Sequence, residues 1–300
     1  MTRAITVYEV GPRDGLQNEP APVPTAAKVA FIDALGAAGV PAIEVTAFVS
    51  PKWVPQMADA ADVCAAIHRR PGTRHIALVP NLAGLDRAVA AGLTEVAIFA
   101  AASETFSRRN INQSIEASLV GYREVTTRAL AAGLRVRGYL STAFGCPFEG
   151  DVAITQVVRL TGALLDFGVY EVSVSDTIGI AHPGQVRHVL DALTREVPAG
   201  ALALHFHDTR GTALANVLAS LDFDIRTFDA SAGGLGGCPY APGATGNLAT
   251  EDLLYMLHGL GYDTGVSIDA VYQASLAIEP VVGHPLPSRY VRARAAASRP

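Results

Sequence analysis

The chain has 300 residues, of which 50% are hydrophobic and 17% charged, and its formal net charge at pH 7 is -5. This apolar content is enough for a sizeable core and argues against a disordered chain. No apolar run approaches the ~18 residues of a membrane span, and the acidic balance lacks the basic field of a general nucleic-acid binder. We therefore expect a compact protein whose partner is neither a membrane nor a nucleic acid.

Short β-rich runs alternate with Ala- and Leu-rich helical stretches along most of the chain. Strands are predicted at 5–9, 42–46, 75–79, 95–100, 135–140, 170–174, 202–207 and 227–231. Helices are predicted between them at 25–38, 57–68, 84–91, 115–132, 151–167, 183–196 and 213–221. The strands begin about 32 residues apart, which is the size of one βα unit. Eight such units predict an α/β fold, a closed (β/α)8 TIM barrel, rather than an open doubly wound sheet.

Extra helices follow the barrel, which we place at about 4–232. The next segment, 233–284, contains a glycine-rich loop and two helical stretches at 250–259 and 267–279. The residues from 285 to 300 are rich in Pro, Arg and Ala and are expected to form a loosely held tail. We expect the whole chain to be one catalytic domain.

The cysteine pattern and the N-terminal residues indicate the cellular compartment of the protein. Cys64, Cys146 and Cys238 are odd in number and widely spaced, so they predict neither a disulfide framework nor a CxxC metal site. The chain enters a strand-like pattern without a signal or transit segment. We expect the cytoplasm.

Polar residues gather where the predicted strands end. In a parallel barrel the loops after the strands meet at one rim, and chemistry collects there. These residues are 11–19 after the first strand, Glu44 in the second, 175–177 after the sixth, 205–208 in the seventh, and 233–240 with Asn247 after the eighth.

His205 and His207 are the most informative pair. Two positions apart on a strand, both side chains lie on the same face. They are either structural histidines bonded to neighbours or metal ligands, and Asp14 with Asn247 favours the second reading. Two nitrogens and two hard oxygens suit Mg²⁺ or Mn²⁺ better than Zn²⁺, Co²⁺ or Fe²⁺.

Arg13 lies beside Asp14 on a glycine-bounded turn. The pair forms either a weak surface salt bridge or two groups directed at one oxygen-rich ligand. Glu44 lies inside an otherwise apolar strand and needs a partner to be buried, which favours a role in holding the Arg13 guanidinium.

Cys238 lies in the glycine-dense loop. A lone cysteine is most often a small buried hydrophobe. In a loop that glycines allow to close over a charged rim, it is better placed as an acid, base or nucleophile. The segment 103–110 after the fourth strand is either a solvated loop or, through its arginines and Asn110, a contact for a phosphate-bearing substrate arm.

These stretches resemble the 3-hydroxy-3-methylglutaryl-CoA lyase family, within a wider class of metal-dependent barrels. The likeness covers about residues 3 to 280. RDG at 13–15 and HFH at 205–207 mark only the wider class. GLGGCPY at 234–240 and the GN-x-ATED segment at 246–252 are specific to the lyase.

The resemblance implies a retro-Claisen cleavage of the acyl-CoA to acetyl-CoA and acetoacetate. The implied metal ligands are Asp14, His205, His207 and Asn247, and Asp14 or Asp176 would act as base. A metal-bound hydroxyl group loses its proton more readily.

The resemblance also suggests roles for the remaining catalytic residues. Arg13 would stabilise the developing enolate, Glu44 would orient Arg13, and Cys238 would protonate the departing carbanion. Glu251 would orient Asn247 or the loop. Expected substrate contacts are Gln17, Asn110, Thr177 and Gly236.

Arg210 departs from the family pattern, which generally has an aromatic residue after His-Asp-Thr. It could recruit a different acid group or pair on the surface, so a related branched 3-hydroxyacyl-CoA is an alternative substrate. A Claisen-type synthase using acetyl-CoA and a 2-oxo acid, and a catalytically silent binding scaffold, are further alternatives. We expect a homodimer or a higher homo-oligomer.

Overall fold

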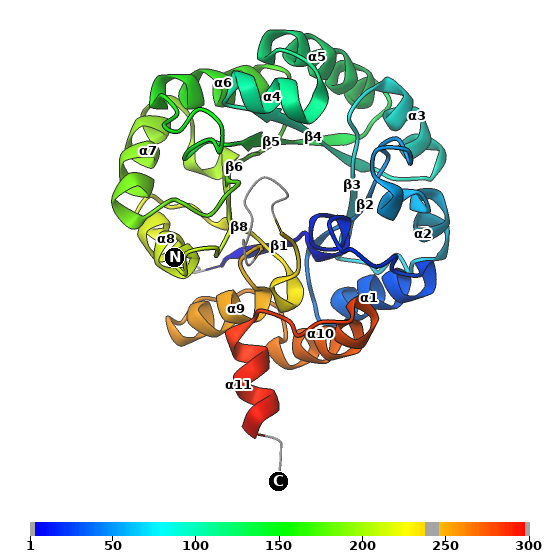
Figure 1. The fold of residues 1–300 in the computed structure, drawn as a ribbon. Coiled ribbons are helices and arrows are strands. Elements are labelled where there is room, and N and C mark those ends of the chain that lie inside the picture. Colours follow the sequence, from blue (N-terminus) through cyan, green and yellow to red (C-terminus); the bar gives the residue numbers. More distant parts are fainter. Residues whose placement is uncertain (1–3, 238–245, 298–300) are drawn as a thin grey trace.

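Eight parallel strands form a closed barrel in the structure, a computed structural model that describes residues 4–237 and 246–297 (Figure 1). The strands pair in chain order, and β1 also pairs with β8, which closes the barrel. They are β1 (Thr6–Glu9), β2 (Ala42–Ala47), β3 (Arg74–Leu78), β4 (Glu95–Ala101), β5 (Arg135–Ser141), β6 (Val172–Asp176), β7 (Leu202–Phe206) and β8 (Thr227–Ala230). The predicted (β/α)8 barrel is confirmed.

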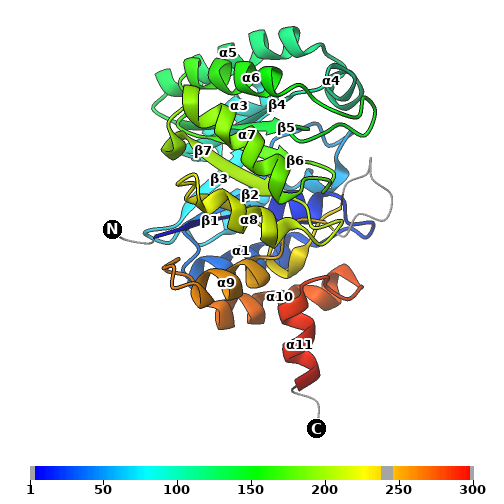
Figure 2. The same cartoon turned by 90° about the vertical axis from the view of Figure 1, so that its left-hand side faces the viewer.

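Helices surround this barrel on its outer face, and the last one, α11, projects away from it beyond α9 and α10 (Figures 1 and 2). They are α1 (Thr25–Ala37), α2 (Ala60–Ala66), α3 (Leu82–Ala90), α4 (Glu104–Ile111), α5 (Ile115–Ala131), α6 (Ile154–Asp166), α7 (Pro183–Glu196), α8 (Ala213–Leu221), α9 (Thr250–Gly259), α10 (Ile268–Val282) and α11 (Arg289–Ala297). Short helical turns among the described residues are η1 (Gly11–Gly15), η2 (Pro55–Met57), η3 (Ala199–Ala201) and η4 (Ala232–Gly234). Within the described ranges, none of the helices combines the length and apolarity that crossing a bilayer requires.

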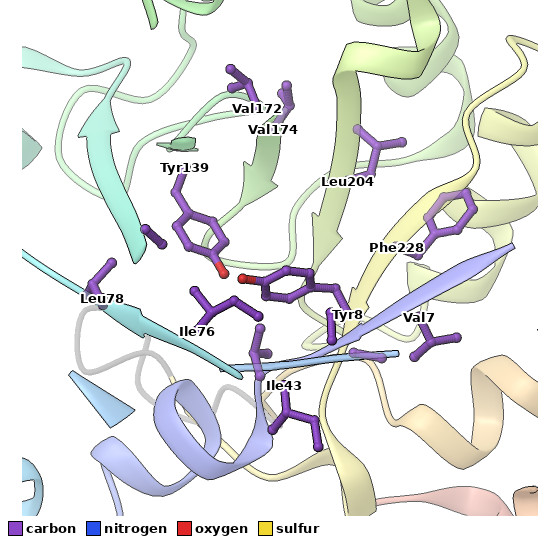
Figure 3. Close-up of a cluster of buried hydrophobic side chains, with 14 of the residues drawn as sticks. Val7, Tyr8, Ile43, Ile76, Leu78, Tyr139, Val172, Val174, Leu204 and Phe228 are labelled. Carbon is purple, nitrogen blue, oxygen red and sulfur yellow. The ribbon is translucent and has the colours of Figure 1, made fainter. Parts of the chain in front are cut away.

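The strands are buried on both faces, because side chains fill the barrel interior and the helices cover its outside. Apolar side chains dominate the cluster in Figure 3, where the hydroxyl groups of Tyr8 and Tyr139 point toward each other. Arg137 lies among them, with its guanidinium carbon 3.8 Å from the centre of the Tyr8 ring and 4.9 Å from that of Tyr139. The barrel therefore encloses a cation within a largely apolar core.

The segment 103–110, for which one alternative was a solvated loop, is instead mostly helical and forms α4. Ser103 begins it by accepting a hydrogen bond from the Phe106 N–H at 3.1 Å, and Glu104 stands in its first turn. A serine cap and an acidic first turn both stabilise a helix N-terminus. The helix ends where Asn112 adopts a left-handed conformation.

The expectation of a loose tail at 285–300 is wrong for most of that range, because α11 occupies it. Asp252 in α9 accepts hydrogen bonds from the Ser288 hydroxyl at 2.8 Å and from the N–H groups of Arg289 and Tyr290 at 3.0 and 2.8 Å. A carboxylate at the N-terminus of a helix satisfies its free N–H groups and complements its dipole. The capping group comes from an earlier helix, so the composition of the tail does not reveal it.

Candidate active site at the carboxyl ends of the strands

A cavity of about 1200 Å³ opens at the carboxyl ends of the strands. This is the rim at which barrel enzymes generally place their chemistry. Several of the predicted site residues line it: Arg13, Asp14, Gln17, Asn110, Thr177, His205 and His207.

The turn η1 brings Arg13 and Asp14 to this cavity. The carbonyl oxygen of Val10 accepts hydrogen bonds from the N–H groups of Arg13, Asp14 and Gly15 at 3.1, 2.7 and 3.1 Å. The chain thus leaves β1 in one wide turn that places both side chains over the barrel mouth. A Cβ atom at Gly15 would lie 2.9 Å from the Cβ of Leu235, so glycine is needed there for the close approach of the two segments.

Arg13 is held between two carboxylates. Its Nε donates to Glu44 Oε2 at 2.6 Å, and its Nη1 donates to Asp14 Oδ1 at 2.8 Å. Burial works to lower the pKa of Arg13, but the charges of Glu44 and Asp14 keep it above the ordinary value. Burial raises the pKa of Glu44, against the charge of Arg13. The guanidinium is therefore a fixed positive charge at the cavity wall.

Asp14, His205 and His207 form a cluster whose candidate ligand atoms all lie within 4.8 Å of one another. Burial works to raise the pKa of Asp14, but Arg13 and the two histidines lower it to about 2, which leaves an anion. Burial and the neighbouring His205 lower the pKa of His207 to about 4, which leaves a neutral imidazole. An anion beside a neutral imidazole is a suitable pair of ligands for a divalent cation.

Asn247 joins this cluster from the segment after β8. Its backbone pairs with His207, and the flanking Leu248 N–H donates to the Phe206 carbonyl at 3.0 Å. The Asn247 side chain donates through Nδ2 to Asp14 Oδ2 at 2.9 Å. The φ of Gly236 is +114°, and a Cβ atom there would lie 2.6 Å from that Nδ2. The absence of a side chain at this position therefore leaves room for the Asn247 amide group.

The donors of this cluster fit a divalent cation. The buried Oδ1 of Asn247 and Nδ1 of His207 have no hydrogen-bond partner among the described residues. An unpaired buried polar atom is costly, and a cation would relieve that cost at the amide oxygen. One carboxylate, one amide oxygen and two imidazoles match the set predicted from the sequence.

Asp176 does not reach the cavity, which corrects the expectation that it acts as base. Its two carboxylate oxygens accept hydrogen bonds from the N–H groups of Ile180 and Ala181, both at 3.0 Å. Its neighbours Ser175 and Thr177 line the cavity instead. Successive residues of a strand face opposite sides, and this alternation was the signal available in the sequence.

Glu251 does not contact Asn247 through any hydrogen bond of the described residues. Its carboxylate accepts from the Gly233 N–H at 2.8 Å and from the Ser275 hydroxyl. Of the two alternatives, the contacts favour the one in which Glu251 holds the start of the glycine-rich loop. Gly236 lines a smaller depression beside the cavity rather than the cavity itself.

The remaining predicted residues divide into three cases. Cys238 lies outside the described residues, and Cys64 and Cys146 are buried. Asn110 and its neighbour Arg109 line the cavity from α4. Arg210 is exposed, and its Nη1 donates at 3.1 and 2.9 Å to the carbonyl oxygens of residues 178 and 179 in the segment after β6.

Sequence reasoning missed three residues of this region. Tyr139 lines the cavity. Arg137 and Asp229 lie inside the barrel, where the guanidinium donates twice to the carboxylate, at 2.7 and 3.2 Å. A charged residue within a short apolar strand, the argument applied to Glu44, was the signal that could have found the last two.

The chain is similar to proteins of known activity along most of its length. The family model described as HMGL-like matches residues 4–278. Hydroxymethylglutaryl-CoA lyase YngG of Bacillus subtilis is 52% identical over 287 residues, which cover 96% of each chain.

Solved structures give the same result. The crystal structure of the Bacillus subtilis HMG-CoA lyase has a TM-score of 0.96 and 50% identity, covering 98% of this chain and 100% of that one. An HMG-CoA lyase from Acinetobacter baumannii, in complex with coenzyme A and 3-methylmalate, has a TM-score of 0.93 and 39% identity, covering 99% and 96%.

Proposed function

We infer that this chain, which belongs to the HMGL-like family, is a hydroxymethylglutaryl-CoA lyase that cleaves (S)-3-hydroxy-3-methylglutaryl-CoA to acetyl-CoA and acetoacetate. The observation that carries this function is the convergence of Arg13, Asp14, His205 and His207 on one cavity. The buried guanidinium of Arg13 lies beside a cluster of metal-ligand side chains. This combination suits a reaction in which negative charge develops on substrate oxygens.

We propose Mg²⁺ or Mn²⁺ as the cation, held by Asp14, His205, His207 and the Asn247 amide oxygen. When bound, such a cation supplies Lewis-acid polarisation of the substrate hydroxyl and carbonyl oxygens. The donor set supports this choice, because it combines hard oxygens with imidazole nitrogens and has no thiolate among the described residues.

Two proton transfers need protein groups: removal of the substrate hydroxyl proton and protonation of the carbanion product. Of the two carboxylates expected as base, only Asp14 lines the cavity, and we propose it as the acceptor of the hydroxyl proton. Cys238, outside the described residues, remains our proposed donor to the departing carbanion.

Arg13 is proposed to stabilise the enolate oxygen of the thioester that forms as the carbon–carbon bond breaks. Its guanidinium is already fixed by Glu44 and Asp14, so it needs no reorganisation as the charge appears. Glu44 is accordingly a positioning residue for Arg13.

The outer part of the cavity is proposed to take the coenzyme A portion of the substrate. Asn110 lines it from α4 and Gln17 from the segment after η1, while Thr177 lines it from the segment after β6. Gly236 is proposed to act through its contact with Asn247. The A. baumannii relative binds coenzyme A, which supports an acyl-CoA substrate here.

Two further proposals concern the location of the protein in the cell and its oligomeric state. We propose a cytoplasmic location and a homodimeric or higher assembly for the chain. Light scattering during size-exclusion chromatography measures the mass in solution, and a monomer at working concentration would contradict the assembly.

The activity is tested by incubating the purified chain with (S)-3-hydroxy-3-methylglutaryl-CoA and Mg²⁺. We expect equal amounts of acetoacetate and acetyl-CoA, and no product after exhaustive chelation until a divalent cation is restored. Branched 3-hydroxyacyl thioesters, and acetyl-CoA with 2-oxo acids, serve as comparison substrates. Faster turnover of one of these, or no acetoacetate at all, would overturn the function.

A further inference from the structure

We propose that Asp229 is a positioning residue for the cation site, which holds His205 through Nδ1 and leaves Nε2 as its ligand nitrogen. The inference rests on the proposed function, because it presupposes that His205 is a metal ligand. Asp229 was not among the residues predicted from the sequence.

Asp229 and His205 are paired across two neighbouring strands. They stand opposite each other in the parallel register of β8 and β7. The Nδ1 atom of His205 lies 3.3 Å from Oδ2 of Asp229, and both side chains are buried. A ligating imidazole usually donates its other N–H to a carboxylate or carbonyl, which fixes its tautomer and ring orientation.

The Asp229 carboxylate is itself fixed in place. Arg137 donates to its two oxygens at 2.7 and 3.2 Å, and the Ser173 hydroxyl donates to Oδ2 at 2.7 Å. With a guanidinium on one side, the carboxylate is ionised and therefore accepts only. The hydrogen of His205 must then be on Nδ1, and Nε2 is the nitrogen free to bind a cation.

The other histidine of the cluster lacks this support. Nδ1 of His207 has no hydrogen-bond partner among the described residues. The two imidazoles are therefore not equivalent: the barrel interior fixes His205 before a cation binds, whereas His207 is left without such a hydrogen bond. Preorganised ligands bind a metal more tightly than ligands that must be ordered on binding.

Glu171 provides a matched control within the same buried network. It accepts from Arg137 through Nε at 2.8 Å, and no hydrogen bond of the described residues joins it to His205. Replacing Glu171 disturbs the ion pairing of Arg137 without touching the histidine. A purely structural role for the network would therefore make Asp229 and Glu171 variants behave alike.

The test compares Asp229→Asn with Glu171→Gln in Mn²⁺ affinity, measured from free Mn²⁺ by electron paramagnetic resonance. An amide nitrogen facing Nδ1 favours the wrong tautomer, so we expect Asp229→Asn to bind Mn²⁺ about 10- to 100-fold more weakly than the parent. Glu171→Gln should stay close to the parent, although thermal unfolding of the metal-free proteins should show both destabilised. Equal affinities in parent and Asp229→Asn, or equal losses in both variants, would overturn the proposal.

A milder variant keeps the proposal testable if Asp229→Asn does not fold. Ser173→Ala removes one of the bonds that fix Asp229 and leaves all charges in place, so we expect a smaller but measurable loss of Mn²⁺ affinity; an unchanged affinity would contradict the proposal. Failure of the proposed function has a different signature: the parent itself, like His205→Ala, would then bind no Mn²⁺ at this site.

Discussion

Arg13 shows how much a single side chain depends on its surroundings in this protein. A guanidinium buried without partners would be strongly destabilising, yet here Glu44 and Asp14 compensate its charge from two sides. The same arrangement leaves the group immobile at the wall of the cavity. Structural compensation and readiness for charge development on the substrate therefore come from the same two contacts.

Arg13→Gln is expected to lower kcat by about 10²- to 10³-fold or more while changing KM little, because the charge it meets appears mainly in the transition state. Glu44→Gln should lower kcat less, since Asp14 still holds the guanidinium. Steady-state kinetics with circular dichroism as the folding control measures both effects. Near-parental kcat in Arg13→Gln would remove this residue from the mechanism.

Among the elements, η4 is held by two buried carboxylates at the start of the glycine-rich segment. Glu9 of β1 accepts from the N–H groups of Gly11 and Ala232 at 2.8 and 2.9 Å and from the Thr250 hydroxyl at 2.7 Å. Glu251 of α9 accepts a hydrogen bond from the N–H group of the next residue of η4, Gly233, at 2.8 Å. Burial raises the pKa of Glu9 to about 7 and that of Glu251 to about 8.

These values predict that stability falls as the pH rises. Between the ordinary pKa of 4.5 and the folded value of about 7, Glu9 binds a proton in the folded chain but not in the unfolded one. The free energy of unfolding therefore decreases across that window, by on the order of 3 kcal/mol for this group.

Glu9→Gln cannot lose a proton, so its free energy of unfolding should fall less between pH 5 and pH 8 than that of the parent. Denaturant unfolding at several pH values, with Glu124→Gln at an exposed position of α5 as a surface control, measures the difference. Identical pH dependence in parent and Glu9→Gln would show that burial of this carboxyl group is not coupled to folding.

At the scale of the whole molecule, the proposed cation site ties together distant parts of the chain. Asp14 follows β1, the two histidines come from the end of β7, and Asn247 comes from the segment after β8. Such a site exists only in the closed barrel, so a cation that binds it binds the folded state alone. Cation binding must then stabilise the fold.

Adding Mn²⁺ to the chelated protein is expected to raise its melting temperature. At a metal concentration of about 100 times Kd the stabilisation amounts to about 2.7 kcal/mol. Differential scanning calorimetry measures the shift, and His207→Ala serves as the variant in which it should be largely lost. An equal shift in parent and variant would mean that the cation binds elsewhere.

The order of strands and helices could be read from the sequence because each element depends on nearby residues, through periodicity, caps and glycine or proline breaks. Where an element depends on a distant residue the prediction was wrong, as for α11, whose N-terminus is capped by Asp252. Helix α4 carried a local cap at Ser103 and was within reach of sequence reasoning.

The sequence by itself determined the barrel, the rim and the residue types gathered there, since parallel βα units admit few closed arrangements and their strand ends meet at one edge. Only the tertiary structure decided which of those side chains meet. It directed Glu251 to η4 and placed Asp229 behind His205. These outcomes depend on contacts between residues far apart in the chain, which one sequence does not specify.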